Sequence, residues 1–130
     1  MHEPGDDFLR MIPRVGSISL GDVEIAWDEI APEERGAAAP PLVLLHGLTG
    51  HRADFLPVLP RLARRLPGLR ILAPDLRGHG DSTHTGDPAS FSFERLVDDL
   101  VRLLDGLAIP RCHLLGHSFG GMVSLRFALR

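Results

Sequence analysis

The chain has 130 residues, of which 44% are hydrophobic and 24% charged, and its formal net charge is −3. This composition is typical of one ordinary soluble domain; it excludes disordered, collagen-like and disulfide-stapled chains and gives no reason to expect nucleic acid as a partner. The single cysteine, Cys112, favours a reducing, cytoplasmic compartment. No apolar run approaches the length of a membrane span. The 14 basic residues are all arginines, which indicates a bacterial source.

The front of the chain predicts a tail followed by a hairpin. Residues 1–14 have no clear periodicity and contain two prolines, so we expect a tail there. Apolar residues then alternate over Val15–Leu20 and Val23–Ile30, on either side of a short turn that contains glycine. Such alternation predicts two antiparallel strands. Residues 31–41 form a connection bounded by prolines that is too short to mark a domain boundary, so residues 15–130 are expected to form one unit.

The middle of the chain has the pattern of a parallel sheet. Leu42–Leu45 and Leu69–Ala73 are short, mostly apolar runs, as expected of strands that are buried on both faces. Between them, Ala53–Arg65 has apolar residues near helical spacing. Pro57 and Pro60 lie inside this segment, so the first half of the helix is expected to be distorted or the helix to begin later.

The last third predicts a helix, a strand and a second helix. The clearest helix is Phe93–Leu107, with Ser92 as its N-cap and one broad apolar stripe. Its charged residues, Asp99 among them, are expected on a solvated face. Strand Cys112–Leu115 leads through a glycine-rich turn into an apolar helix. The order, an antiparallel hairpin followed by parallel β-α-β-α-β-α, predicts an α/β fold with right-handed crossovers.

One serine has an unusual setting. Of the seven serines, only Ser118 has glycine both two residues before and two residues after it. It lies between a predicted strand and a predicted helix, where a sharp turn that exposes a nucleophile requires small neighbours. The positive end of the helix dipole would stabilise an oxyanion beside its Oγ. The sequence therefore predicts Ser118 as a nucleophile.

Three segments in order carry a resemblance to a known family. They are Leu44–Gly47 (LLHG), Asp75–Ser82 (DLRGHGDS) and Gly116–Gly121 (GHSFGG). Together they resemble the N-terminal part of an α/β-hydrolase fold protein of the serine esterase type, over about residues 15–130. The resemblance implies that Ser118 is the nucleophile and that the backbone N–H groups of Leu48 and Phe119 form the oxyanion hole. It implies structural roles for the other polar residues of these motifs, His46, Asp75, His79 and His117.

The rest of a catalytic triad is not found in this sequence. In the family the nucleophile is followed along the chain by an acid and then a histidine. Residues 119–130 contain no His, Asp or Glu. We therefore expect the sequence to be a fragment of a protein about twice as long, and residues 1–130 alone to be inactive.

The leading hypothesis is a hydrolase of small esters or related acyl compounds that acts through an acyl-enzyme at Ser118, with no cofactor or metal. Serine instead of aspartate at the turn argues against the dehalogenase and epoxide-hydrolase branches, whereas acyltransferase and perhydrolase activities stay open. A non-catalytic binding module is the alternative if the natural chain ends at Arg130. Dinucleotide binding has little support, because Gly78-His79-Gly80 lacks the third glycine of that motif.

Overall fold

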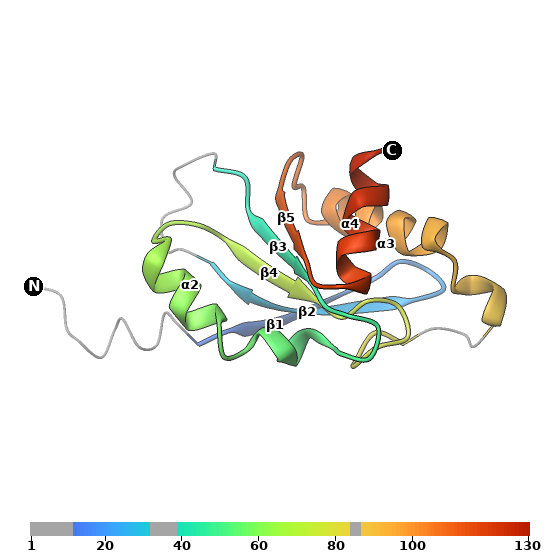
Figure 1. The fold of residues 1–130 in the computed structure, drawn as a ribbon, viewed down its shortest axis with the longest axis horizontal. Helices are drawn as coiled ribbons and strands as arrows, with labels where there is room; N and C mark the ends of the chain where they lie inside the picture. Colours follow the sequence, from blue (N-terminus) through green and yellow to red (C-terminus); the bar gives the residue numbers. More distant parts are fainter. Residues whose placement is uncertain (1–11, 32–38, 84–86) are drawn as a thin grey trace, which may run out of the picture.

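The fold is built on one mixed sheet. The computed structural model describes residues 12–31, 39–83 and 87–130. Among these residues five strands pair in the order β1-β2-β4-β3-β5 (Figure 1). Their bounds are β1 Arg14–Ser19, β2 Glu24–Ile30, β3 Leu42–Leu45, β4 Ile71–Pro74 and β5 His113–Gly116. β1 and β2 form the antiparallel hairpin, β2 pairs antiparallel with β4, and β3 runs parallel to both β4 and β5.

Helices cover both faces of the sheet. The helical segments are η1 Arg52–Phe55, α2 Leu59–Arg65, η2 Pro88–Ser90, α3 Phe93–Gly106 and α4 Phe119–Ala128. Figure 1 shows α2 on one side of the sheet and α3 and α4 together on the other. Side chains alternate along β3 to match: Val43 and Leu45 pack with α3 and α4, whereas Leu44 packs with α2. This alternation buries β3 on both faces, as its apolar sequence predicted.

The order and type of the main elements are confirmed, with small shifts at their ends. Arg14 already belongs to β1, and residues 1–11 of the predicted tail lie outside the described residues. The same is true of residues 32–38 in the predicted connection.

The segment predicted as one helix over Ala53–Arg65 divides into η1 and α2. Pro57 lies between the two elements and Pro60 in the first turn of α2, where a residue without an N–H group is tolerated.

The prediction that Asp99 lies on a solvated face of α3 is wrong. Asp99 is 5% exposed, and its two carboxylate oxygens accept hydrogen bonds of 2.8 Å from Nε and Nη2 of Arg77. Arg77 is fully buried and also donates to Asp22 in the turn between β1 and β2. These hydrogen bonds, first to Asp99 and then to Asp22, raise the pKa of Arg77 above its ordinary value. The cluster joins the hairpin, the segment after β4 and α3.

Candidate active site

Ser118 occupies a strained turn between β5 and α4. Its φ of 55° and ψ of −111° place a non-glycine residue in a backbone region that side chains rarely adopt. The residue is exposed at the point where β5 ends and α4 begins. The structure thus has the sharp strand-to-helix turn that the sequence pattern predicted.

Two glycines allow the turn to pack against β3. A Cβ atom on Gly120 would lie 2.2 Å from the carbonyl oxygen of Leu45 and 2.6 Å from that of His46. A Cβ atom on Gly116 would lie 2.3 Å from the carbonyl oxygen of Gly120. Because real Cβ atoms do not approach backbone this closely, the glycines on both sides of Ser118 are required by the close contact of β5, α4 and β3.

The loop after β3 lies beside the same turn. Leu45, the last residue of β3, is in register with Gly116, the last residue of the parallel strand β5, so the two chain segments leave the sheet at one edge. The His117 N–H donates to the Leu45 carbonyl oxygen at 2.9 Å. A Cβ atom on Gly47 would lie 3.3 Å from Nδ1 of His117. The structure therefore brings the loop with Leu48 against the turn with Ser118.

Several backbone N–H groups at this edge, those of Leu48 and Phe119 among them, have no acceptor among the described residues. Leu48 is 60% exposed, and Phe119 is the first residue of α4. The N–H groups in the first turn of a helix have no partner within the helix and lie at the positive end of its dipole. Both predicted oxyanion residues thus present free donors beside the Ser118 turn.

His46 is held in a neutral form by its neighbours. It is 1% exposed; its Nε2 accepts the Leu76 N–H at 3.0 Å, and its Nδ1 lies 2.7 Å from the Gly47 carbonyl oxygen. Nε2 as acceptor and Nδ1 as donor correspond to one neutral tautomer. Burial lowers the pKa of His46, which favours the same form. With both ring nitrogens engaged, His46 is not available as a base for Ser118.

Asp75 anchors the segment that follows β4. Its buried carboxylate accepts the N–H of Arg52 at 2.7 Å and the N–H of Asp81 at 2.9 Å, and it also pairs with the Arg52 guanidinium. That guanidinium contacts Asp81 at 2.8 Å and Asp28 of β2 at 3.1 Å. A Cβ atom on Gly80, whose φ is +51°, would lie 2.3 Å from Asp75. Asp75 therefore has the structural role that the sequence resemblance implied.

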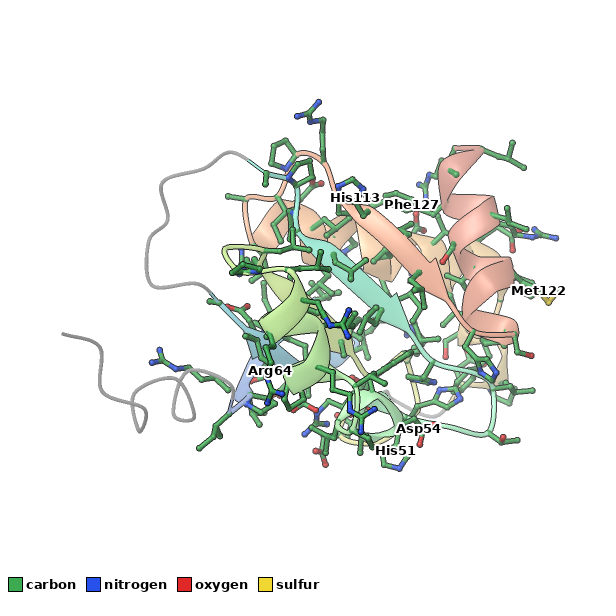
Figure 2. All side chains as sticks on the ribbon, turned by 60° about the vertical axis from the view of Figure 1, so that its left-hand side comes forward. His51, Asp54, Arg64, His113, Met122 and Phe127 are labelled. Atoms are coloured by element: carbon green, nitrogen blue, oxygen red, sulfur yellow. The ribbon has the colours of Figure 1, made fainter. Side chains whose placement is uncertain are left out.

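The sequence did not indicate the importance of Arg52 and Asp28. They are 24 residues apart, and their neighbours show no periodicity that would pair them. Only the position of Arg52 two residues after Gly50, in the loop that follows β3, could have drawn attention to it. Figure 2 shows the start of η1, where the His51 N–H donates to Asp54 Oδ2 at 3.2 Å.

Ser118 lines neither of two surface hollows that are formed by described residues. One, of about 560 Å³, lies between α3 and α4 and is lined by Phe93, Arg126 and Leu129 among others. The other, of about 570 Å³, lies beside Arg52 and Asp81. Within the described residues we find no group of three or more His, Cys, Asp or Glu arranged to hold a metal ion. The described helices are all too short or too polar to cross a bilayer.

Comparisons with known proteins agree on one fold. A family model described as alpha/beta hydrolase fold matches residues 40–130. RutD of Stutzerimonas stutzeri (strain A1501), named as a candidate carbamate hydrolase, is 44% identical over 91 residues, which are 70% of this chain and 33% of that protein. ABHD11 of Danio rerio, named an sn-1-specific diacylglycerol lipase, is 39% identical over 124 residues, which are 93% of this chain and 37% of that protein.

The solved structure of the epoxide hydrolase VrEH1 from Vigna radiata matches with a TM-score of 0.79 and 26% identity, over 92% of this chain and 36% of that one. The chain thus spans about a third of the length of the relatives that it matches.

Proposed function

Because the chain belongs to the α/β-hydrolase fold family, we propose that it supplies the nucleophile and the oxyanion hole of a serine hydrolase that acts on small esters or related acyl compounds. The observation that carries this proposal is the strained φ of Ser118, in a turn beside the loop of Leu48, with the N–H groups of Leu48 and Phe119 lacking an acceptor among the described residues. A strain of this kind persists only where the surrounding structure enforces it, and it is typical of functional sites.

The proposed reaction proceeds through a covalent intermediate. Ser118 Oγ attacks the substrate carbonyl carbon, and the electrons of the carbonyl π bond move to its oxygen. The N–H groups of Leu48 and Phe119 donate to that oxyanion. Collapse of the tetrahedral intermediate expels the alcohol, and water then hydrolyses the acyl–Ser118 ester.

A base must take the Ser118 proton and return it to the leaving group. No residue after Ser118 in this sequence can do so, because residues 119–130 contain no His, Asp or Glu. We propose that the base and its acid partner come from chain beyond Arg130. The length of the relatives supports this, since the matched part is about a third of each.

The chemistry of the nucleophile supports acyl substrates. The names of two relatives give carbamate and diacylglycerol as their substrates. Each of these compounds contains a carbonyl carbon that a nucleophile can attack. The matching structure carries the name of an epoxide hydrolase, but serine at position 118 instead of aspartate favours carbonyl attack here. Acyl transfer to an acceptor other than water, including peroxide, would use the same residues and is the second candidate. A cytoplasmic location, expected from the lone cysteine, stays a prediction.

Covalent labelling tests the proposal. An organophosphonate ester that mimics the tetrahedral intermediate is added to the protein expressed with the chain that follows Arg130, and the labelled peptide is identified by mass spectrometry. We expect label on Ser118 alone, and none in Ser118→Ala. Ser124→Ala is the matched control, since Ser124 lies in the same helix and its hydroxyl already donates to the Gly120 carbonyl oxygen at 2.8 Å. Unchanged labelling of Ser118→Ala would show that the nucleophile is a different residue.

A further inference from the structure

We infer that His79 is a positioning residue for the oxyanion hole: its ring N–H holds the carbonyl group of Leu48, and thereby sets the direction of the Leu48 N–H. The inference rests on the proposed function, because it assigns the residue that orients one of the two proposed oxyanion donors. Its structural basis is the 2.6 Å contact between Nε2 of His79 and the carbonyl oxygen of Leu48.

The loop after β3 has little else to hold it. Its glycines, Gly47 and Gly50, have no side chains to pack, and the side chain of Leu48 is 60% exposed. The Gly50 N–H donates to the Gly47 carbonyl oxygen at 3.0 Å, but this bond lies within the loop. Among the described residues, the contact from His79 is the one hydrogen bond that joins residues 47–49 to a separate segment.

His79 itself belongs to a rigid segment. The Gly78 N–H donates to the Ser82 carbonyl oxygen, and the His79 and Ser82 N–H groups donate to Leu76 and His79 carbonyl oxygens, all at 2.9 Å. Arg77, one residue before Gly78, is fully buried between two carboxylates. Because the turn that carries His79 is fixed on both sides of this residue, the His79 ring can support the less constrained loop after β3.

The neighbours of the ring require a donor at Nε2. A carbonyl oxygen only accepts, so Nε2 must carry hydrogen to bind Leu48. Nδ1 of His79 lies 2.9 Å from the Arg77 carbonyl oxygen, which also only accepts. This contrasts with His46, 4.9 Å away between ring centroids, whose Nε2 accepts a backbone N–H. His79 therefore differs from His46 in facing an acceptor, and not a donor, at Nε2.

The consequence is an effect on the transition state. The carbonyl group and the N–H group of Leu48 belong to one residue. If the carbonyl group loses its hydrogen bond to His79, the N–H group can therefore turn away from the oxyanion. An oxyanion donor acts chiefly in the transition state, so its misplacement lowers kcat and leaves KM almost unchanged. A displacement of about 1 Å at such a donor can cost up to about 100-fold in rate.

The test compares two variants of equal length in the protein expressed with the chain beyond Arg130. His79→Met removes the donor, whereas His79→Gln keeps an N–H donor near the position of Nε2. We expect kcat for an aryl ester to fall about 10- to 100-fold in His79→Met, with KM changed less than about twofold, and to recover to within about fivefold of the original in His79→Gln. His113→Met is the control, because His113 is exposed at the far end of β5 (Figure 2).

Three results would overturn the inference. Equal losses of kcat in His79→Met and His79→Gln would show that the donor is not what matters. A rise in KM with unchanged kcat would place His79 in substrate binding instead. Long-range ¹H–¹⁵N NMR of the original protein reads the ring directly, without any variant, and an Nε2 without hydrogen would exclude the bond to Leu48. Ser118→Ala, assayed in parallel, separates the two proposals, because turnover that survives it contradicts the serine mechanism itself.

Discussion

Arg77 and Asp99 face each other through two parallel hydrogen bonds of 2.8 Å, with the Arg77 side chain fully buried and that of Asp99 6% exposed. Paired geometry of this kind is among the strongest side-chain interactions in proteins. It connects α3 to the segment that carries His79, so the stability of the fold and the geometry of the candidate site depend on the same contact.

Removing the carboxylate should destabilise the protein strongly. Asp99→Ala leaves the buried guanidinium with Asp22 alone, and breaking a buried ion pair costs about 3–5 kcal/mol. Urea unfolding should show a loss near this size. Asp105→Ala is the matched control, since Asp105 lies on the exposed side of the same helix and should change stability by less than about 0.5 kcal/mol. Similar losses in the two variants would contradict the role of the Arg77 pair.

A methyl group at Gly120 should disrupt the Ser118 turn. Its Cβ would lie 2.2 Å from the Leu45 carbonyl oxygen, and neither atom can rotate away, because the Cβ is fixed by the backbone of α4 and the oxygen belongs to the backbone of β3. Gly120→Ala should lower stability by about 1–3 kcal/mol or more and abolish labelling of Ser118. Gly121→Ala places a Cβ 3.3 Å from the Gly116 oxygen, so its effect should be smaller. Thermal unfolding and labelling of both variants test whether Gly120→Ala has the larger effect. Unchanged stability and labelling in Gly120→Ala would contradict this prediction.

Acid should weaken the contact between the hairpin turn and Arg77. The hydrogen bond from Arg77 lowers the pKa of Asp22 below its ordinary value of 3.8. A carboxylate with a lowered pKa in the folded state adds stability that is complete above the ordinary value and is lost as the pH falls toward the lowered one. The original protein and Asp22→Asn should therefore differ in their free energy of unfolding by a constant amount above about pH 5, and this difference should shrink below about pH 4. A difference that stays constant down to pH 2.5 would contradict the role of the ion pair.

The oxyanion hole should depend on the backbone of Leu48 and not on its side chain. Leu48→Pro removes the N–H, and loss of one oxyanion donor costs about 100- to 1,000-fold in kcat. Leu48→Ala keeps the N–H and should retain kcat within about tenfold. Circular dichroism of both variants shows whether the fold is kept. Equal kcat in the folded variants would place the oxyanion elsewhere.

Residues 1–130 produced alone should have negligible turnover and should self-associate. In the described sheet β5 pairs only with β3, and an unpaired strand edge invites association. Leu115 of β5, Met122 and Leu125 of α4, and Leu129 directly after α4 are exposed apolar residues. Figure 2 shows Met122 on the outer side of α4 and Phe127 on the side toward β5.

Sedimentation of this chain measures the association. Leu115→Lys should reduce it, because a charged side chain on an edge strand blocks pairing. Leu56→Lys is the control, since Leu56 is 41% exposed in a different part of the molecule. A monomer with turnover that depends on Ser118 would show that the base lies within residues 1–130.

Local patterns in the sequence were sufficient to predict the strands and the Ser118 turn. Continuous apolar runs predicted β3 and β4, because burial on both faces depends only on residues within each run. Asp99 shows the limit of such patterns, since its partner Arg77 is 22 residues away. One signal was present: Asp99 lies three residues after Leu96 and four before Leu103, at the spacing of the buried stripe. The contact between His79 and Leu48 joins two loops and has no counterpart in any local periodicity.

The strand order has a further consequence for where a ligand can lie. From β3 the chain moves to β4 on one side, whereas β5 lies on the other side of β3. The segments that follow β3 and β5 therefore leave toward opposite faces of the sheet, one toward α2 and the other into α4. In open α/β sheets such a topological switch point opens a crevice outside the carboxyl ends of the two strands. Leu48 and Ser118 follow these two strands, so the path of the backbone predicts a place for a substrate between their segments before any side chain contributes to binding.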